Sequence, residues 1–239
     1  MNILDMKIAN INFQKEIDER CKSCFLNTYQ HLFEKFNVDI DVKQKFLVFY
    51  NETLIKIKFL SSPEIQRILN NGFCKLISIN DPFKEEKAKS NQIALELYRQ
   101  WKPKVKSSAN PFDLSLRLSI AGNIMDYGAN SSFDIHKTIE KVLNTSFAIN
   151  HSELLKKNIK NAKRILYLGD NAGEIVFDKL FVETTNHQEV FYAVKGNPVL
   201  NDVTLADTKE VGMQLVAKVI SNGFDAPSTI LNKCSQEFL

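Results

Sequence analysis

The sequence has little of several features that mark particular protein classes. It contains no run approaching the ~18 to 20 apolar residues that a membrane-spanning helix needs. The N-terminus carries Asp5 and has no apolar core, so it does not read as a secretory signal. Four cysteines in 239 residues do not suggest a disulfide framework. These absences predict a cytoplasmic protein with no membrane partner.

The sequence also lacks a large excess of charge of one sign, and it lacks the common catalytic motifs. The net charge of +3 is too small to indicate a nucleic-acid partner, and the lysines are scattered along the chain. The sequence has no Walker loop, no Gly-x-Ser-x-Gly elbow and no Gly-x-Gly-x-x-G turn. What remains is an ordinary globular composition, 44% hydrophobic and 25% charged.

The first hundred residues show mainly the spacing of amphipathic helices. Ser61-Ser62-Pro63-Glu64 is a capping signal with proline in the first helical turn. A strong helix is predicted over 84–101, with Lys102-Pro103 ending it. The polar stretch up to Asn110-Pro111 is the best candidate boundary. The sequence therefore predicts a mainly helical subdomain over 1–108 and an α/β domain over 109–239.

The second part of the chain contains a strand, a helix and a strand in succession. These elements are predicted at 164–169, 174–183 and 189–194, which is a βαβ unit and implies a parallel sheet. The apolar residues of 211–222 fit either a strand or a helix. The predicted class is therefore α/β with a mainly parallel sheet.

Polar side chains follow both strands of the βαβ unit. Asp170 and Asn171 come after the first strand, and Lys195 and Asp202 come after the second. Ligands of open α/β sheets bind at this edge, and helix N-termini such as Gly173-Glu174 attract phosphate. Carboxylate and amide oxygens suit magnesium, manganese or a similar ion, and Lys195 supplies positive charge for a phosphate. The alternative is that Asp-Asn-Ala-Gly is only a helix cap and turn.

The chain resembles the prokaryotic-type branch of the damage-control phosphatase family, formerly a domain of unknown function. The matching segments keep their order and spacing through most of the sequence. They are Cys21-Lys22-Ser23-Cys24, Asp81-Pro82-Phe83-Lys84, Lys89-Ser90-Asn91, Arg117 with Ala121 to Gly128, Gly169 to Glu174, and Lys195 to Asp202.

The resemblance implies a three-layer α/β/α domain with an added all-helical N-terminal subdomain. It also implies a metal-dependent phosphatase acting on small phosphorylated metabolites, often damaged ones. We hypothesise that such an enzyme hydrolyses a sugar phosphate or damaged metabolite by direct attack of a metal-oriented water. Asp170, Asn171 and Asp202 become the metal ligands and the catalytic set. Asn123, Asp126, Lys195, Gly173 and Glu174 are then expected to contact the substrate or its phosphate. An oxygen-rich site of this kind admits manganese, cobalt, nickel or magnesium.

One departure from the family leaves an alternative function open. Members of the family continue past the level of Cys234 into a further strand and a phosphate-side segment, which this sequence does not show before Leu239. The α/β domain is therefore expected to be short at its C-terminus. The alternative is a phosphometabolite-binding protein with weak or no turnover.

Cys21 and Cys24 lie one turn apart on a predicted helix. This spacing permits a second metal site or redox chemistry, although no second Cys-x-x-Cys provides further ligands. The two thiols can equally be small buried hydrophobic groups.

Overall fold

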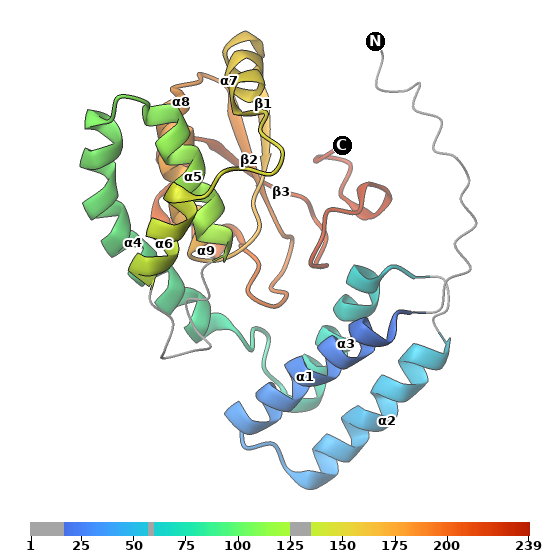
Figure 1. The fold of residues 1–239 in the computed structure, drawn as a ribbon. Helices are drawn as coiled ribbons and strands as arrows, with labels where there is room; N and C mark the ends of the chain where they lie inside the picture. Colours follow the sequence, from blue (N-terminus) through green and yellow to red (C-terminus); the bar gives the residue numbers. More distant parts are fainter. Residues whose placement is uncertain (1–16, 57–59, 125–134) are drawn as a thin grey trace. The chain divides into compact units, whose positions relative to one another are not determined.

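The computed structural model describes residues 17–56, 60–124 and 135–239, and the chain divides into two compact units (Figure 1). Unit 1 comprises residues 1–79 and unit 2 comprises residues 80–239. The division falls one helix before the 108/109 boundary expected from sequence. Helix α4 (Lys84–Ser107) packs against α8 (Glu174–Thr185) and α9 (Leu205–Val211), so it belongs to the α/β unit.

In its described residues, 17–56 and 60–79, unit 1 has three helices around an aromatic cluster. They are α1 (Glu19–Lys35), α2 (Ile40–Lys56) and α3 (Ser62–Ile77). Ser61 caps α3 as its sequence predicts, because its backbone N–H donates to Glu64 Oε2 at 3.0 Å. The rings at the centre have centroids 4.5 to 6.0 Å apart and come from all three helices: Tyr29, Phe33, Phe46 and Phe73. The many phenylalanines of this region therefore form a packed core.

Unit 2 is built on a parallel sheet of three strands in the order β1-β2-β3. The strands are β1 (Ile165–Leu168), β2 (Val190–Val194) and β3 (Lys218–Ser221). In register, Tyr167 lies beside Tyr192, and Tyr192 lies beside Val219. The remaining elements of the unit are α5 (Pro111–Ile124), α6 (Ile135–Asn144), α7 (Ser152–Asn161), η2 (Met213–Leu215) and η3 (Leu231–Lys233).

Helices α4, α5 and α8 form the core of unit 2 together with one face of the sheet. Helix α8 packs against both α5 and α4, and Figure 1 shows these helices gathered on one side of the strands. Ile175, Phe177 and Tyr192 are fully buried at this contact. Leu166 and Leu168 of β1 point to the other face and remain about half exposed. The architecture confirms the helix-rich α/β class with a parallel sheet.

Packing decides where α4 ends and what the segment 211–222 forms. Pro103 does not end α4, because the helix continues to Ser107 and thereby buries Val105, which is 3% exposed, in the core. The prediction that Lys102-Pro103 terminates the helix was wrong. The ambiguous segment 211–222 contains β3, which pairs with β2.

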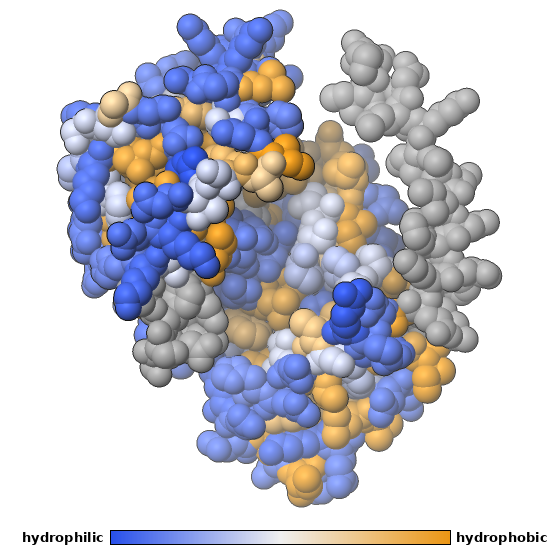
Figure 2. Space-filling model, viewed as in Figure 1, coloured by the Kyte–Doolittle hydropathy of each residue, from blue (hydrophilic) through white to orange (hydrophobic). Residues whose placement is uncertain are grey.

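No helix among the described segments is long and apolar enough to span a membrane. Figure 2 shows hydrophilic side chains predominating over the α4 side of unit 2, with apolar residues interspersed elsewhere.

Candidate functional site

The two polar turns predicted from sequence are joined directly by backbone hydrogen bonds. Asn171 and Asp202 form an antiparallel bridge just beyond β1 and β2. Ala172 N–H donates to Asn201 O at 2.9 Å, and Val203 N–H donates to Asp170 O at 2.8 Å. The bridge therefore fixes Asp170, Asn171 and Asp202 next to one another at the carboxyl edge of the sheet.

Two amides and two carboxylates form a hydrogen-bonded cluster at this edge. Asn123, at the end of α5, donates through Nδ2 to Glu174 Oε2 at 2.9 Å and to Asp170 Oδ2 at 3.3 Å. Asn171 Nδ2 donates to the same two oxygens, at 3.2 Å to Glu174 and 3.0 Å to Asp170. The structure thus brings together four of the residues that the sequence assigned to the site.

Lys195 and Asp202 form a buried ion pair beside this cluster. The Lys195 Nζ lies 3.3 Å from Asp202 Oδ2, and both side chains are about 95% buried. Lys195 N–H also donates to Val203 O at 3.0 Å, which ties the end of β2 to the Asp202 loop. Asp202 Oδ2 is nevertheless buried without accepting a hydrogen bond from the described residues.

Burial raises the pKa of two of these carboxyl groups to near neutrality. The pKa of Asp202 rises to about 7, chiefly through burial and also through the charge of Asp170, while Lys195 and Lys87 act in the opposite direction. The pKa of Glu174 rises to about 7 through burial and through the charge of Asp178. The buried carboxyl groups of the site therefore lie close together, and the nearby lysines do not fully offset the cost of ionising them.

Asp178 lies behind the cluster, one helical turn along α8 from Glu174. It is fully buried and accepts hydrogen bonds from three hydroxyl groups: Ser119 at 2.7 Å, Tyr167 at 2.6 Å and Tyr192 at 2.7 Å. Burial raises the pKa of Asp178 to about 6, although these hydroxyl groups oppose the rise. Asp178 thereby ties α5, α8, β1 and β2 together beneath the site.

The start of α8 has fewer free donors than the sequence suggested. Gly173, which has φ +82° and caps the helix, donates its N–H to Asn91 Oδ1 at 2.8 Å. Ala172 N–H is bound to Asn201 O, and Ile175 N–H is bound to Asn171 O. These N–H groups hold the turn in shape, because each already has an acceptor within the chain.

Sequence reasoning assigned no role to three buried groups near the site: Lys87, Asn91 and Asp178. Asp178 has a visible signal, a carboxylate within the apolar run Ile175 to Phe181 of α8. Lys87 and Asn91 are spaced four residues apart and so share one face of α4. Both residues contact Asp207, more than a hundred residues away along the chain, so the spacing of the sequence does not reveal this contact.

The oxygen-rich edge fits a divalent cation by the chemistry of its donors. Two carboxylates and an amide come from the two joined turns, and the buried Asp202 Oδ2 accepts no hydrogen bond from the part of the chain that the structure describes. Within the described residues, no three Asp, Glu, His or Cys side chains form a metal centre by themselves. A cation here would use the Asn171 oxygen as well as the carboxylates. Asp126, expected to line the pocket, lies outside the described residues.

Comparison with known proteins places the chain in a family. The model of the damage-control phosphatase ARMT1-like domain matches residues 17–239. The chain belongs to this family. The resemblance drawn from the motifs is therefore confirmed, and the two polar turns described above lie within the matched segment.

Relatives from several archaea share this domain. The damage-control phosphatase PH1575 of Pyrococcus horikoshii is 31% identical over 241 residues, covering 94% of this chain and 79% of that protein. An uncharacterized protein of Methanocaldococcus jannaschii, MJ0202, is 42% identical over 176 residues, covering 69% of this chain. A damage-control phosphatase of Archaeoglobus fulgidus is 28% identical over 174 residues. The matches span only 57% and 58% of the latter two proteins.

The fold is also similar to a crystal structure. A DUF89 family protein from Pyrococcus horikoshii, PH1575, superposes with a TM-score of 0.80 at 28% identity. The superposition covers 94% of this chain and 80% of that one. The structural match therefore includes the helical part as well as the α/β unit.

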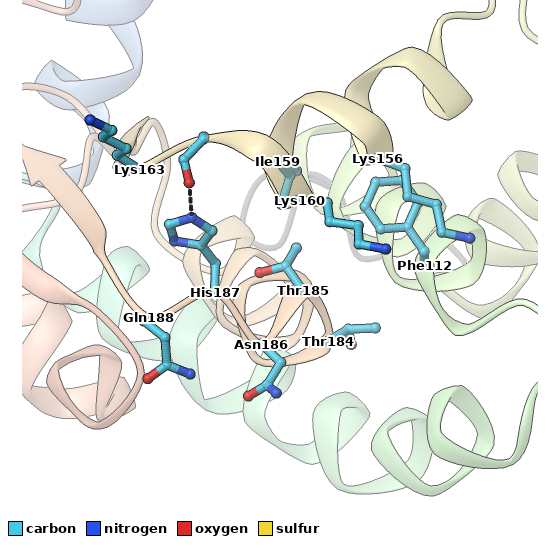
Figure 3. A pocket seen from close by; sticks show the side chains of 11 residues that line it. Phe112, Lys156, Ile159, Lys160, Lys163, Thr184, Thr185, Asn186, His187 and Gln188 are labelled. Atoms are coloured by element: carbon cyan, nitrogen blue, oxygen red, sulfur yellow. Dashed lines mark hydrogen bonds between the residues drawn. The ribbon is translucent and has the colours of Figure 1, made fainter.

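A cavity of about 540 Å³ lies at the opposite end of α8 from the candidate site (Figure 3). Its lining includes Lys156 and Lys160 of α7 and Thr184 and Thr185 at the end of α8. Helix α8 has 12 residues, so its two ends are roughly 18 Å apart. This cavity is therefore distinct from the edge that carries Asp170 and Asp202.

Cys21 and Cys24 lie in α1 of unit 1. Cys21 is half-buried and accepts a hydrogen bond from Ser62 Oγ at 3.6 Å, whereas Cys24 is exposed. The described residues place no third Cys, His, Asp or Glu ligand around them. A metal or redox role for this pair stays a prediction.

Proposed function

We propose that this chain is a divalent-metal-dependent phosphatase that hydrolyses a small phosphorylated metabolite, a sugar phosphate or a damaged phosphometabolite. The observation that carries the proposal is the Asn171–Asp202 bridge in a damage-control phosphatase domain. It joins the turn of Asp170 and Asn171 to the turn of Asp202 at the edge where α/β sheets bind ligands, which supports a shared cation site there. The phosphatase names of the Pyrococcus and Archaeoglobus relatives support the same reaction class.

In this proposal Asp170, Asn171 and Asp202 hold the cation. When bound, a divalent ion supplies Lewis acidity, lowers the pKa of a water molecule and neutralises charge on the phosphate. Manganese, cobalt, nickel and magnesium all suit such oxygen donors. The two buried carboxyl groups of raised pKa support the proposal, because a cation would favour their ionised forms.

The remaining residues bind and orient the substrate. Lys195 provides a positive charge for the phosphate oxygens, and its ion pair with Asp202 keeps that charge beside the cation ligands. Asn123 orients Asp170 and Glu174 through its Nδ2. Asp126 is proposed to line the same pocket, and Gly173 shapes the turn through its left-handed backbone.

The test is phosphate release from p-nitrophenyl phosphate and a panel of sugar phosphates, after chelation and addition of each of the four metals. The decisive variant is Asp170→Ala, because Asp170 is exposed and its loss leaves no buried charge unpaired. Asp202→Ala is less clean, since it strands buried Lys195. The matched control is Asp41→Ala, on the exposed side of α2 in unit 1.

Metal-dependent release that Asp170→Ala abolishes and Asp41→Ala retains supports the proposal. Equal activity of Asp170→Ala and the wild type would show that the site is wrongly placed. A metal-induced rise in melting temperature without phosphate release from any substrate would instead support the phosphometabolite-binding alternative.

A further inference from the structure

Asn91 of α4 connects the two sides of the candidate site through one buried amide. Its side chain is fully buried. Oδ1 accepts the Gly173 N–H at 2.8 Å. Nδ2 donates to Glu210 Oε2 at 2.9 Å and to Asp207 Oδ1 at 3.4 Å. A backbone N–H can only donate and an ionised carboxylate can only accept, so these partners fix which way the amide points.

The two ends of this connection belong to the two turns that carry the proposed cation ligands. Gly173 closes the turn that begins with Asp170 and Asn171, and it caps α8. Asp207 is in the first turn of α9, and the N-cap of this helix, Thr204, comes two residues after Asp202. The backbone hydrogen bonds of the Asn171–Asp202 bridge already join these turns directly. Asn91 joins them a second time, through Gly173 on one side and the first turns of α9 on the other.

Helix α4 holds the α9 side with a second residue. Lys87, one turn before Asn91, places Nζ 3.5 Å from Asp207 Oδ2 and 2.8 Å from Asp81 Oδ2. Asp207 Oδ2 also accepts the Thr204 N–H at 2.8 Å, which completes the cap of α9. Asp207 is therefore held by Lys87, Asn91 and the start of α9. Asn91 links this fixed carboxylate to the Asp170 turn through its bond to Gly173.

We propose that Asn91 is a positioning residue, which keeps Asp170 and Asn171 in register with Asp202 for cation binding. The inference rests on the proposed metal-dependent function. It differs from a purely structural role, which would stabilise the contact between α4 and α8 without affecting the site. The chain offers a matched comparison, because Tyr98 of α4 donates to Glu183 at 2.8 Å near the other end of α8.

The test variant is Asn91→Asp. It keeps an acceptor for Gly173 N–H but turns a carboxylate toward Asp207 and Glu210. The double variant Asn91→Asp with Glu210→Gln restores the hydrogen bond in the opposite direction, because the new amide at position 210 can donate to the new carboxylate at position 91. Glu210 is exposed, so this second change introduces no strain. Tyr98→Phe removes one polar contact between α4 and α8 away from the site, the hydrogen bond to Glu183, and serves as the control.

The primary readout is the dissociation constant for Mn²⁺, obtained from how the melting temperature of chelated protein rises as Mn²⁺ is added. Asn91→Asp is expected to raise this dissociation constant by about tenfold or more, as the loss of groups that orient ligands does in other metal sites. The double variant regains most of the lost affinity, and Tyr98→Phe matches the wild type. In metal-free Asn91→Asp, amide exchange across residues 170–175 is faster than in the wild type.

Three results would overturn the positioning role. The first is an unchanged dissociation constant for Mn²⁺ in an Asn91→Asp protein that melts cooperatively. The second is a Tyr98→Phe protein whose dissociation constant rises as much as that of Asn91→Asp. The third is a double variant that binds Mn²⁺ no more tightly than Asn91→Asp. Phosphate release is followed separately in the same samples. A wild type that binds Mn²⁺ without releasing phosphate refutes the phosphatase function, while the Asn91→Asp shift still decides the positioning role. A wild type that does neither refutes both.

Discussion

Replacing Glu174 by glutamine should make the metal-free protein more stable at alkaline pH. Glu174 is 9% exposed, and only its Oε2 accepts the two amides, Asn123 and Asn171. A glutamine oxygen can accept the same bonds without a buried charge. The folded pKa of about 7 lies above the ordinary 4.5, so the folded chain keeps a proton that the unfolded chain releases between these pH values.

The sign and size of the effect follow from this pKa difference. Folding stability falls as pH rises from 4.5 to about 7, because the folded state binds more protons in that window. A difference of about 2.5 pKa units corresponds to about 3 kcal/mol when the full penalty is reached. Glu174→Gln should therefore be more stable than the wild type by up to about 3 kcal/mol at pH 8 and by less than about 1 kcal/mol at pH 5.

The assay is urea unfolding of chelated protein at pH 5 and pH 8, with the unfolding free energy extrapolated to water. Glu153→Gln, an exposed change of equal charge on α7, is the control and should keep the pH dependence of the wild type. The reasoning is refuted if Glu174→Gln loses as much stability as the wild type between the two pH values. That result would mean that Glu174 is not held in a protonated state by its surroundings.

Two other substitutions test the packing and the cysteines. Gly169→Ala should lower the unfolding free energy by about 1 to 3 kcal/mol, because a Cβ there would lie 2.5 Å from the ring of Tyr192, whose hydroxyl bonds to Asp178. Urea unfolding measures this change, and an unchanged unfolding free energy would contradict the tight contact. Cys21→Ser with Cys24→Ser should leave Mn²⁺-induced stabilisation unchanged in a melting assay, because the described residues give these thiols no further metal ligand; a lost or weakened shift would show that unit 1 contributes to metal binding.

The βαβ unit and the position of its two polar turns could be predicted because their signals are local. Apolar runs ended by glycine and asparagine mark β1 and β2, and parallel strands must end at the same edge of the sheet. That is enough to expect the turns of Asp170 and Asp202 near each other, and the Asn171–Asp202 bridge joins these two turns. The family resemblance assigned further residues to the site, and the structure finds Asn123 and Glu174 in the same cluster.

The parts that sequence could not provide depend on distant partners. Pro103 is locally a helix breaker, but burial of Val105 outweighs that preference and α4 continues. Asn91 lies 116 residues from Asp207 and 82 from Gly173, so these contacts are visible only once the helices are packed. The raised pKa values of Glu174 and Asp202 likewise arise from burial, which no motif specifies.

The most direct test of the central claim is phosphate release by chelated protein when metal is restored, with wild type and Asp170→Ala compared on one sugar phosphate. The account predicts that manganese, cobalt, nickel or magnesium restores turnover to the wild type and not to the variant, while both proteins melt cooperatively. Turnover that is insensitive to chelation, or equal in the two proteins, would contradict a cation held by Asp170, Asn171 and Asp202.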